Sequence, residues 1–396
     1  MENQQKIEKS DENQPAVPSP IRLFLSFFRL GLTAFGGPAM IVYIADLAVR
    51  RKQWMNQETF KNGVALSQSL PGATAMQTAA YVGLRMRGLS GALASYVGFG
   101  LPAFIFMVIL SSLYVTSRSL PWVVSLFSGL QVIVVAIVAH AAFSFGRTTI
   151  KHYGEVFLAS ASALALLLSA SPFLVIIAAA IAGIFTLKSD RLTSSEQLSK
   201  DYPSKVVLMT LLLAVPAGLS YLYTFKPDFF WLAWLMLKID LFAFGGGFAS
   251  LPLMLEEIVH THGWMDSRTF MDGIALGQIT PGPIIITAAF VGYLLYGIAG
   301  ATVAAIAIFT PSFVLLVLAA PFFDKLSQSH LFRSALAGIL ASFVGLLFAV
   351  TVKFSIGVPW DLVRVLLAVV SFCLLLRKVD ILYIVVIGAV ISIFMF

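Results

Sequence analysis

The residues best suited to chemistry lie at four glycine- and proline-rich interruptions of apolar segments. Two read Phe-Gly-Gly-Pro (35–38) and Phe-Gly-Gly-Gly (244–247), and two read Gln-Ser-Leu-Pro-Gly (68–72) and Gln-Ile-Thr-Pro-Gly (278–282). Glycine pairs followed by proline unwind a helix, and proline is favoured where the next helix begins. Each new helix start leaves backbone N–H groups without a partner and carries a partial positive charge. Four such starts would bind an oxyanion with little formal charge.

Side chains that can donate hydrogen bonds to a tetrahedral oxyanion accompany these interruptions. Gln68 and Gln278, and likewise Thr78 and Thr287, recur in both copies and are the strongest side-chain candidates. The polar residues around the first Pro-Gly are Ser67, Gln68, Ser69, Thr74, Gln77 and Thr78. The candidate substrate-binding residues are Gly36, Gly37, Pro38, Gln68, Ser69, Pro71, Gly72, Thr78, Gly245, Gly246, Gln278, Thr280, Pro281, Gly282 and Thr287. The alternative is structural, because small and polar residues also mediate close packing and hydrogen bonding between membrane helices.

Charged residues within the apolar segments are candidates for a charge or coupling role. They are Arg29, Lys238, Asp46, Glu256 and Asp240. The first four form two corresponding pairs, one member in each copy. Ionisable groups inside a membrane usually mark a substrate or proton path, but a long side chain near a segment end can instead reach the interface. Asp240 has no acidic counterpart, because Gly31 takes that place, so Asp240 could give the site an asymmetric role in proton coupling.

The interruptions belong to an internal duplication. Each copy carries a Trp-Met pair, at 54–55 and 264–265, and a Thr-Ala-Ala-aromatic-Val-Gly sequence, at 78–83 and 287–292. The spacing between the copies is therefore 210 residues at the first motif and 209 at the second. Duplicated apolar segments interrupted by glycine and proline are typical of secondary transporters, whose binding site lies between the repeats.

Composition places the chain in a membrane. Hydrophobic residues make up 59% of the 396 residues and charged residues 11%, whereas a soluble domain carries about 25% charged residues. The net charge of +7 lies in short clusters between apolar runs, which is typical of topogenic loops and not of nucleic-acid binding. One cysteine excludes an intramolecular disulfide and a thiolate metal site. Because no nucleotide-binding or catalytic motif occurs, we expect no enzyme activity, no cofactor and no metal.

The predicted fold is an all-α integral membrane protein with two homologous multi-helix halves in inverted orientation and broken helices at the centre. We expect a disordered cytoplasmic tail (1–20), an N-terminal repeat (21–187), a polar linker plus helix (188–228) and a C-terminal repeat (229–396). There are thirteen apolar runs, of which 61–84 and 269–294 either cross the membrane or re-enter it. In the re-entrant case, the basic cluster 50–52 lies on the same side as Arg85 and Arg87. A homodimer is one alternative for the oligomeric state.

The combination of Phe-Gly-Gly-Pro, Trp-Met and Gln-x-x-Pro-Gly, repeated after a polar linker, resembles the chromate ion transporter (CHR) family in its long, two-domain form. The resemblance covers about residues 20–396. It implies a multi-pass transporter of the prokaryotic plasma (inner) membrane that extrudes chromate, with sulfate as analogue, driven by proton-motive force or anion exchange. The implied functional residues are Gly36, Gly37, Pro38, Gln68, Pro71, Gly72, Gly245, Gly246, Gln278, Pro281 and Gly282.

Two points stay open within this resemblance. Gly247 occupies the position that corresponds to Pro38. The helix after the interruption 244–247 therefore need not begin at the position where the helix after 35–38 begins, and Pro252 is a later candidate start. Broken helices also line pores, so a passive anion channel is the main alternative function. A transporter of another small or organic anion is a further alternative.

Overall fold

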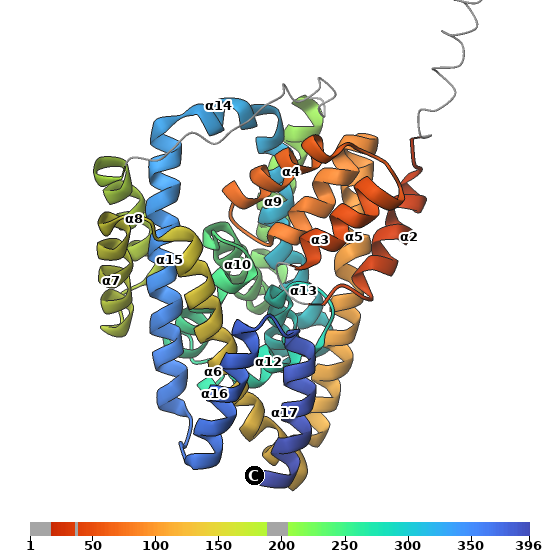
Figure 1. Ribbon diagram of the computed structural model, residues 1–396. Helices are drawn as coiled ribbons and strands as arrows, with labels where there is room; N and C mark the ends of the chain where they lie inside the picture. The colour runs from red at the N-terminus through yellow and green to blue at the C-terminus, as the bar shows by residue number, and fades with distance from the viewer. Residues whose placement is uncertain (1–16, 36–38, 188–204) are drawn as a thin grey trace, which may run out of the picture.

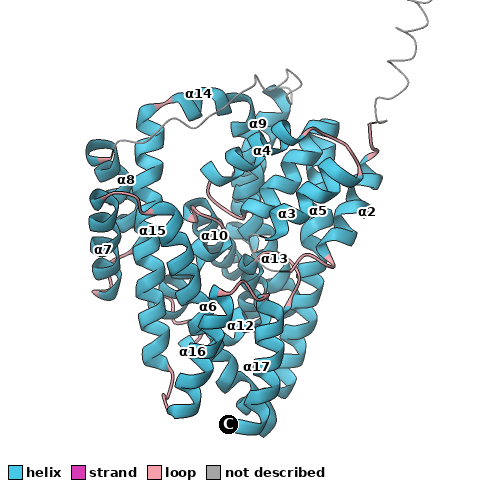
Figure 2. Cartoon of the chain, in the orientation of Figure 1, coloured by secondary structure: helices cyan, strands magenta, loops and turns pink. Residues whose placement is uncertain are grey.

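The computed structural model describes residues 17–35, 39–187 and 205–396. In these residues every regular element is a helix, and one isolated β-bridge pairs Pro71 with Phe244 (Figure 2). The predicted all-α fold is confirmed. Residues 1–16 of the predicted tail, the interruption residues 36–38 and linker residues 188–204 lie outside the described residues.

The two halves contain corresponding helices in the same order, and among the described residues the second half has four further short elements. The first half consists of α2 (Pro20–Gly31), α3 (Ala39–Ala45), the π-helical turn η1 (Asp46–Arg51), α4 (Gln57–Ser69), α5 (Thr74–Ser117), α6 (Pro121–Thr149), α7 (Tyr153–Leu167) and α8 (Pro172–Thr186). After the linker helix α9 (Lys205–Phe225), the second half begins with α10 (Pro227–Phe242), η2 (Gly247–Ala249), α11 (Ser250–Met254), η3 (Leu255–Thr261) and α12 (Ser267–Ile279). It ends with η4 (Ile284–Ile286), α13 (Thr287–Ala319), η5 (Ala320–Phe322), α14 (Phe323–Gln328), α15 (His330–Gly357), α16 (Leu362–Leu376) and α17 (Ile381–Met395). The four further elements are η2, η4, η5 and α14.

Local sequence sets where these helices begin. Proline occupies one of the first two positions of α2, α6, α8 and α10, where its missing N–H costs nothing. Asn56 caps α4 by accepting from the Thr59 N–H at 2.7 Å, and Asp266 caps α12 by accepting from the Thr269 N–H at 2.8 Å. Because α4 and α12 begin with corresponding caps, they lead to the Pro-Gly interruptions in the same register.

Helices α4 and α12 each form a hairpin with the helix that follows the Pro-Gly interruption. A Cβ added to Gly63 would lie 2.1 Å from the Tyr81 ring, and one added to Gly273 would lie 2.4 Å from the Phe290 ring. In each pair the two residues lie about equally far from the interruption, on opposite sides of it. The segments on both sides of Pro71-Gly72 are therefore antiparallel, with the interruption at the hairpin tip. This geometry favours the re-entrant alternative for 61–84 and 269–294.

Helices α5 and α13 each contain a sharp reversal. Gly88 (φ +59°) and Gly297 (φ +62°) have left-handed backbone inside these helices. The arms before and after Gly88 pack so closely that a Cβ on Gly83 would lie 2.1 Å from the carbonyl oxygen of Gly91. The Arg87 Nε donates to the Pro18 carbonyl at 3.2 Å, so this reversal lies beside the start of α2.

The halves run in opposite directions and interlock. The Leu187 carbonyl accepts from Ser334 near the start of α15, whereas Arg364, just beyond the end of α15, donates to Ser128 in the first third of α6. The corresponding helices α6 and α15 therefore begin at opposite ends of the molecule (Figure 1). Helices α7 and α8 pack against α15, while α16 and α17 pack against α6. The predicted inverted repeat is confirmed.

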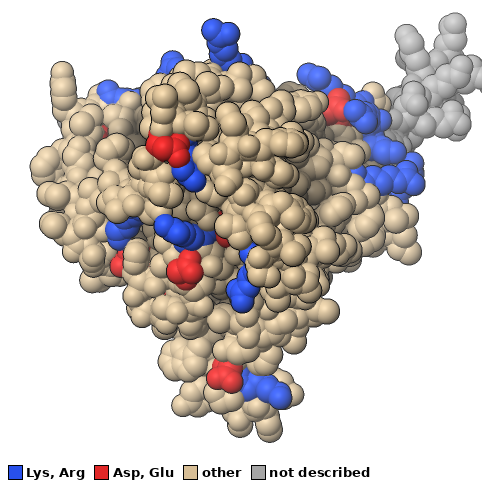
Figure 3. Space-filling model, turned by 90° about the horizontal axis from the view of Figure 1, so that it is seen from below, with Lys and Arg blue, Asp and Glu red and all other residues tan. Residues whose placement is uncertain are grey.

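Helix lengths fit a membrane protein. Within the described ranges, four helical segments are long and apolar enough to cross a bilayer, namely Thr74–Ser117, Pro121–Thr149, Ile284–Phe322 and His330–Gly357. Two of the thirteen predicted apolar runs, 22–48 and 229–255, are each divided into separate helices in the structure. Figure 3 shows few charged side chains among many uncharged ones on the face seen from below.

Candidate functional site

Two backbone hydrogen bonds join the interruptions of one half to those of the other. The Gly72 N–H donates to the Ala243 carbonyl at 2.8 Å, and the Gly282 N–H donates to the Ala34 carbonyl at 2.9 Å. Gly72 corresponds to Gly282, and Ala34 corresponds to Ala243, so the two bonds are related by the inverted repeat. The hairpin tip at Gly72 therefore bonds to the segment just after α10, and the tip at Gly282 bonds to the segment just after α2.

Glycine is required at both hairpin tips. Gly72 has φ +106° and Gly282 has φ +116°, a backbone conformation that side chains strongly disfavour. The candidates Gly245 and Gly246 also have positive φ, at +97° and +96°. The prediction that these motifs break the helices is thus confirmed at the interruptions that the structure describes. Gly36, Gly37 and Pro38 lie outside the described residues.

Three helix starts from both halves converge where the interruptions meet. A Cβ on Gly246 would lie 3.5 Å from the Thr74 hydroxyl oxygen, at the first residue of α5. A Cβ on Gly247 would lie 3.8 Å from the backbone nitrogens of Ile284 and Ile285, at the start of η4. Gly247 is itself the first residue of η2. The helix that follows the interruption 244–247 therefore begins at Gly247, five residues before the alternative start at Pro252.

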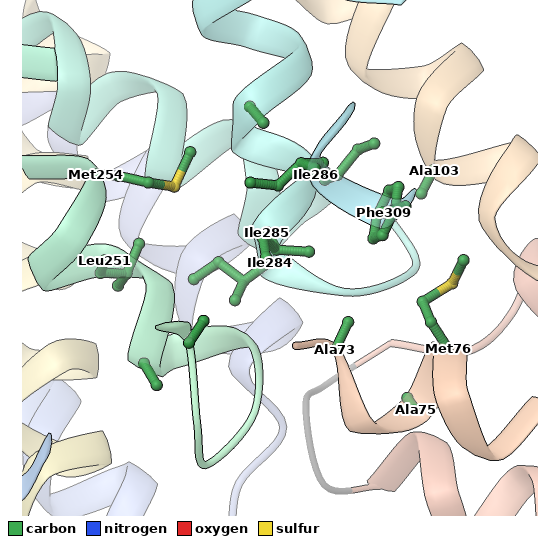
Figure 4. Close-up of a cluster of buried hydrophobic side chains, with 14 of the residues drawn as sticks. Ala73, Ala75, Met76, Ala103, Leu251, Met254, Ile284, Ile285, Ile286 and Phe309 are labelled. Atoms are coloured by element: carbon green, nitrogen blue, oxygen red, sulfur yellow. The ribbon is translucent and has the colours of Figure 1, made fainter. Parts of the chain in front are cut away.

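Several buried apolar side chains lie around this convergence. Figure 4 shows Ala73 and Met76 at the start of α5 opposite Ile284, with Leu251 beside it. These four side chains are buried. Polar side chains are present as well, because the Thr74 hydroxyl lies at the start of α5 and the Ser312 hydroxyl oxygen accepts from the Ala73 N–H at 3.2 Å.

The candidate hydroxyl groups donate hydrogen bonds within their own helices or hairpin tips. Their acceptors are backbone carbonyls three or four residues earlier, at 2.8–2.9 Å, for Ser69, Thr78, Thr280 and Thr287. Such bonds use the single hydroxyl proton and leave the oxygen lone pairs. In the described arrangement, these hydroxyls can accept hydrogen bonds at the site but have no proton left to donate to an anion.

The three glutamines near the hairpin tips differ in their surroundings. Gln68 is exposed, whereas Gln278 is half-buried and its Nε2 is buried with no hydrogen-bond partner among the described residues. Gln77, one of the polar residues around the first Pro-Gly, is fully buried. Its Nε2 donates to the Pro71 carbonyl at 2.8 Å and to the Ser312 carbonyl at 3.2 Å. Gln278 is thus the repeated glutamine with a free donor near a tip.

Asp240 is the charged candidate that lies against a hairpin tip. It is fully buried, and its Oδ2 accepts from the Ser312 N–H at 2.7 Å and the Ser312 hydroxyl at 2.6 Å. A Cβ on Gly72 would lie 2.9 Å from the Asp240 Oδ1. The Ala73 N–H donates to the Ser312 hydroxyl oxygen at 3.2 Å. Sequence reasoning missed Ser312, although the chain carries a signal for it: Ser312 follows the duplicated Pro311, where the first copy has Ala103 after Pro102.

The other charged candidates lie in different surroundings. Arg29 is exposed. The remaining three form ion pairs, which are Asp46 with Arg51 at 2.5 Å, Lys238 with Glu257 at 2.8 Å and Glu256 with Lys353 at 3.0 Å. Lys238 also lies 3.8 Å above the Phe173 ring centroid. Because Asp46, Lys238 and Glu256 are each paired with an opposite charge, none of these three has an unpaired charge that could attract a substrate.

Comparisons with known proteins agree with this architecture. The family model described as chromate transporter matches residues 21–184 and again 230–393, which are the two repeats. An uncharacterised transporter of Methanocaldococcus jannaschii is 43% identical over 95% of this chain and 94% of its own length. A chromate transport protein of Cupriavidus metallidurans is 30% identical over 90% of this chain and 88% of its own length. A probable chromate transport protein of Synechococcus elongatus is 30% identical over 81% and 80%, respectively.

No solved structure matches the chain. The family model covers most of the chain in two copies, and its boundaries coincide with the halves that the inverted repeat defines. The chain belongs to the chromate transporter family.

Proposed function

We propose that the protein is a secondary transporter of a tetrahedral oxyanion, with chromate as the main substrate and sulfate as its analogue. The relatives named as chromate transport proteins support this choice of substrate class. In this proposal the anion binds where the interruptions of the two halves meet. Proton-motive force or exchange with another anion drives its extrusion from the cytoplasm.

The observation that carries the proposal is the convergence of helix starts at Gly247, Thr74 and Ile284. The first N–H groups of a helix have no acceptor in their own helix, and the helix dipole adds partial positive charge there. Such N–H groups bind anions without any cationic side chain. Apolar neighbours such as Ile284 and Met76 exclude water and so strengthen these hydrogen bonds.

The inverted repeat supports a carrier mechanism. In transporters of this kind, one half rocks against the other around a central site, so that the site opens to each side in turn. The hydrogen bonds from Gly72 to Ala243 and from Gly282 to Ala34 link the halves at that centre. Since the two bonds occupy corresponding positions, a motion that opens one side has an equivalent on the other.

Reconstituted transport tests this proposal against a passive channel. Purified protein in liposomes is loaded with unlabelled sulfate, and uptake of labelled sulfate is measured with chromate, molybdate and small organic anions as competitors. We expect saturable uptake that is stimulated by internal anion and inhibited by chromate. Unsaturated anion current at very high turnover would establish a channel. Competition by organic anions alone would contradict the oxyanion assignment.

A proline substitution tests the role of the backbone directly. Thr74 is the first residue of α5, where proline is compatible with a helix but removes one N–H. We expect Thr74→Pro to weaken sulfate binding by about 1.5–3 kcal/mol, one hydrogen bond to a charged group. Thr74→Ala, which keeps the N–H, separates this effect from loss of the hydroxyl. Leu362→Pro, at the exposed first position of α16, is the matched control and should bind normally. Equal affinities for Thr74→Pro and Thr74→Ala would argue against binding by this N–H.

A further inference from the structure

The two hairpin tips are equivalent in backbone but not in side chains. A polar cluster of Asp240, Ser312 and Gln77 surrounds the tip at Gly72. The corresponding residues around the tip at Gly282 are Gly31, Ala103 and Ile286. A Cβ on Gly282 would accordingly meet the Ala103 methyl group at 2.7 Å, and not a polar group. Of the two corresponding hairpin tips in the described part of the chain, only the one at Gly72 therefore lies beside a carboxyl group and a serine that donates hydrogen bonds to it.

The Asp240 carboxyl group is satisfied on one oxygen only. Both hydrogen bonds from Ser312 reach Oδ2, while Oδ1 is buried and has no hydrogen-bond partner among the residues that the structure describes. Oδ1 lies on the side of Gly72, two residues before the start of α5. The same applies to the Gln77 Oε1, which is also buried without a partner there.

Among the residues that the structure describes, Asp240 forms no ion pair. Helix α13, which packs along α10, contains no Lys, Arg, His, Asp or Glu, and neither does α11. From α5, Tyr96 is the titratable group that interacts with Asp240, and its hydroxyl donates to the Phe309 carbonyl at 2.7 Å. On α10 itself, Lys238 is paired with Glu257.

The remaining titratable groups on α9 and α13, which pack against α10, are four tyrosines and Lys205, the first residue of α9. At the other end of α10, the Tyr296 ring of α13 contacts the Phe229 ring, and the Tyr223 ring of α9 contacts the Phe230 ring edge-on. Tyr293 of α13 and Tyr221 of α9 are the others. An ionised carboxylate in this setting is costly because Asp240 is fully buried and forms no ion pair with a described residue, and a proton on Oδ1 removes that charge.

We propose that Asp240 binds the proton that is transported together with the anion. The inference rests on the proposed function, because it needs an anion at the adjacent start of α5. Consecutive Cα atoms are about 3.8 Å apart, so Gly72, which Asp240 touches, lies within about 8 Å of Thr74. An anion there repels an ionised Asp240 and not a protonated one. Proton binding and anion binding therefore favour each other, so that the proton crosses the membrane together with the anion. Because the proton gradient of a plasma membrane points inward, it opposes extrusion by such a step, and exchange with another anion is then the driving force among the two named above.

The step itself is a simple protonation. One proton from water binds to the Asp240 carboxylate when the anion enters and returns to water when the anion leaves. The carrier with anion and proton bound is therefore less negative by one charge than the carrier with the anion alone. By linkage, the factor by which the proton raises anion affinity equals the factor by which the anion raises proton affinity.

Proton uptake on anion binding tests the proposal in the wild-type protein. Sulfate is the probe because it stays fully ionised around neutral pH, so that any proton change comes from the protein. Purified full-length protein in weakly buffered solution with an indicator dye is titrated with sulfate, and sulfate affinity is measured from mildly acidic to mildly alkaline pH. We expect proton uptake on binding, and an affinity that falls about 5–150-fold as pH rises, the usual range for coupled sites.

Two variants assign the proton to its residue. Asp240→Asn should bind sulfate with an affinity that no longer depends on pH and without proton uptake. Asp272→Asn is the matched control, since Asp272 is buried as well but both of its oxygens accept hydrogen bonds, from Gln131 at 2.8 Å and from Tyr114 at 2.9 Å. This control should keep proton uptake.

The outcomes separate the inference from the proposed function. Sulfate binding by the wild type without proton uptake would overturn the role of Asp240 and leave the anion site standing, whether or not the variants fold. Persistent uptake in Asp240→Asn, or its loss in Asp272→Asn, would overturn the assignment to Asp240. A wild type that binds neither sulfate nor chromate would refute the proposed function itself.

Discussion

Alanine at Gly72 should destabilise the protein far more than alanine at Gly282, although the two positions correspond. Both glycines have φ above +100°, and a Cβ in that conformation costs about 1–3 kcal/mol. At Gly282 the added methyl group would lie 2.7 Å from the Ala103 Cβ, and such overpacking costs a further 1–3 kcal/mol or so. Gly282→Ala should therefore lower the free energy of unfolding by about 2–6 kcal/mol.

At Gly72 the same methyl group would lie 1.8 Å from the Ser312 hydroxyl oxygen and 2.9 Å from the Asp240 Oδ1. The Ser312 hydroxyl must then leave its position and lose its bond to the carboxylate, worth about 1.5–3 kcal/mol, and its bond from the Ala73 N–H, worth about 0.5–1.5 kcal/mol. Because the Ser312 Cβ and the Asp240 Oδ1 would each still lie 2.9 Å from the new methyl group, an overpacking cost like that at Gly282 remains. Gly72→Ala should thus exceed Gly282→Ala by the two lost bonds, about 2–4.5 kcal/mol.

Denaturant unfolding in detergent, followed by tryptophan fluorescence, measures this difference. The matched control is the Ser312→Ala background, which lacks the hydroxyl oxygen that the new methyl group would strike. In that background the effect of Gly72→Ala should fall toward that of Gly282→Ala, with a coupling energy of about 0.5–3 kcal/mol. Equal destabilisation by Gly72→Ala and Gly282→Ala, or zero coupling to Ser312, would refute the described contact between this tip and the polar cluster.

Two further predictions concern the anion site and the membrane orientation. Gly246→Ala and Gly297→Ala both place a methyl group at positive φ with no heavy atom closer than 3.5 Å. They should destabilise similarly, but Gly246→Ala alone should weaken sulfate binding, because its methyl group lies beside the start of α5; equal sulfate affinities would contradict the site. In a Cys373→Ser background, Ser119→Cys should react with an impermeant maleimide outside intact cells, whereas Thr186→Cys should react only after permeabilisation. The expectation rests on the prediction that the polar linker 188–204, which follows Thr186, faces the cytoplasm, and the reverse pattern would show that this orientation is wrong.

Much of the architecture could be predicted because glycine and proline act locally. The Pro71-Gly72 and Pro281-Gly282 motifs fix backbone conformation within a few residues, so the sequence alone locates these breaks. The fixed spacing between the copies then pairs the elements, and the basic clusters give an orientation. Glycines also mark the reversals at Gly88 and Gly297, which separate apolar runs that the sequence already divides.

What could not be predicted depends on which distant segments meet. Ser312 lies 72 residues beyond Asp240 in an apolar helix, and only the packing of α13 against α10 joins them. The correspondence of Arg29 with Lys238 predicts similar roles. However, Lys238 pairs with Glu257, and the residue that corresponds to Glu257 in the first half is Leu47, which cannot pair with Arg29 in this way. Repetition in sequence therefore identifies equivalent backbone more reliably than equivalent charge.

Features that occur in both copies and features that occur in one copy have different roles in the proposed transport mechanism. The bonds from Gly72 to Ala243 and from Gly282 to Ala34 occur in both copies. An inward-open and an outward-open state built on such equivalent contacts differ little in energy, and alternating access needs states of similar energy. Coupling to a proton needs the opposite, a group that occurs once for each anion site. We propose that Asp240 is this group, because Gly31 stands at the corresponding position of the other half. A second acid at Gly31 would put another carboxylate beside the same anion and raise the number of protons needed to neutralise the centre.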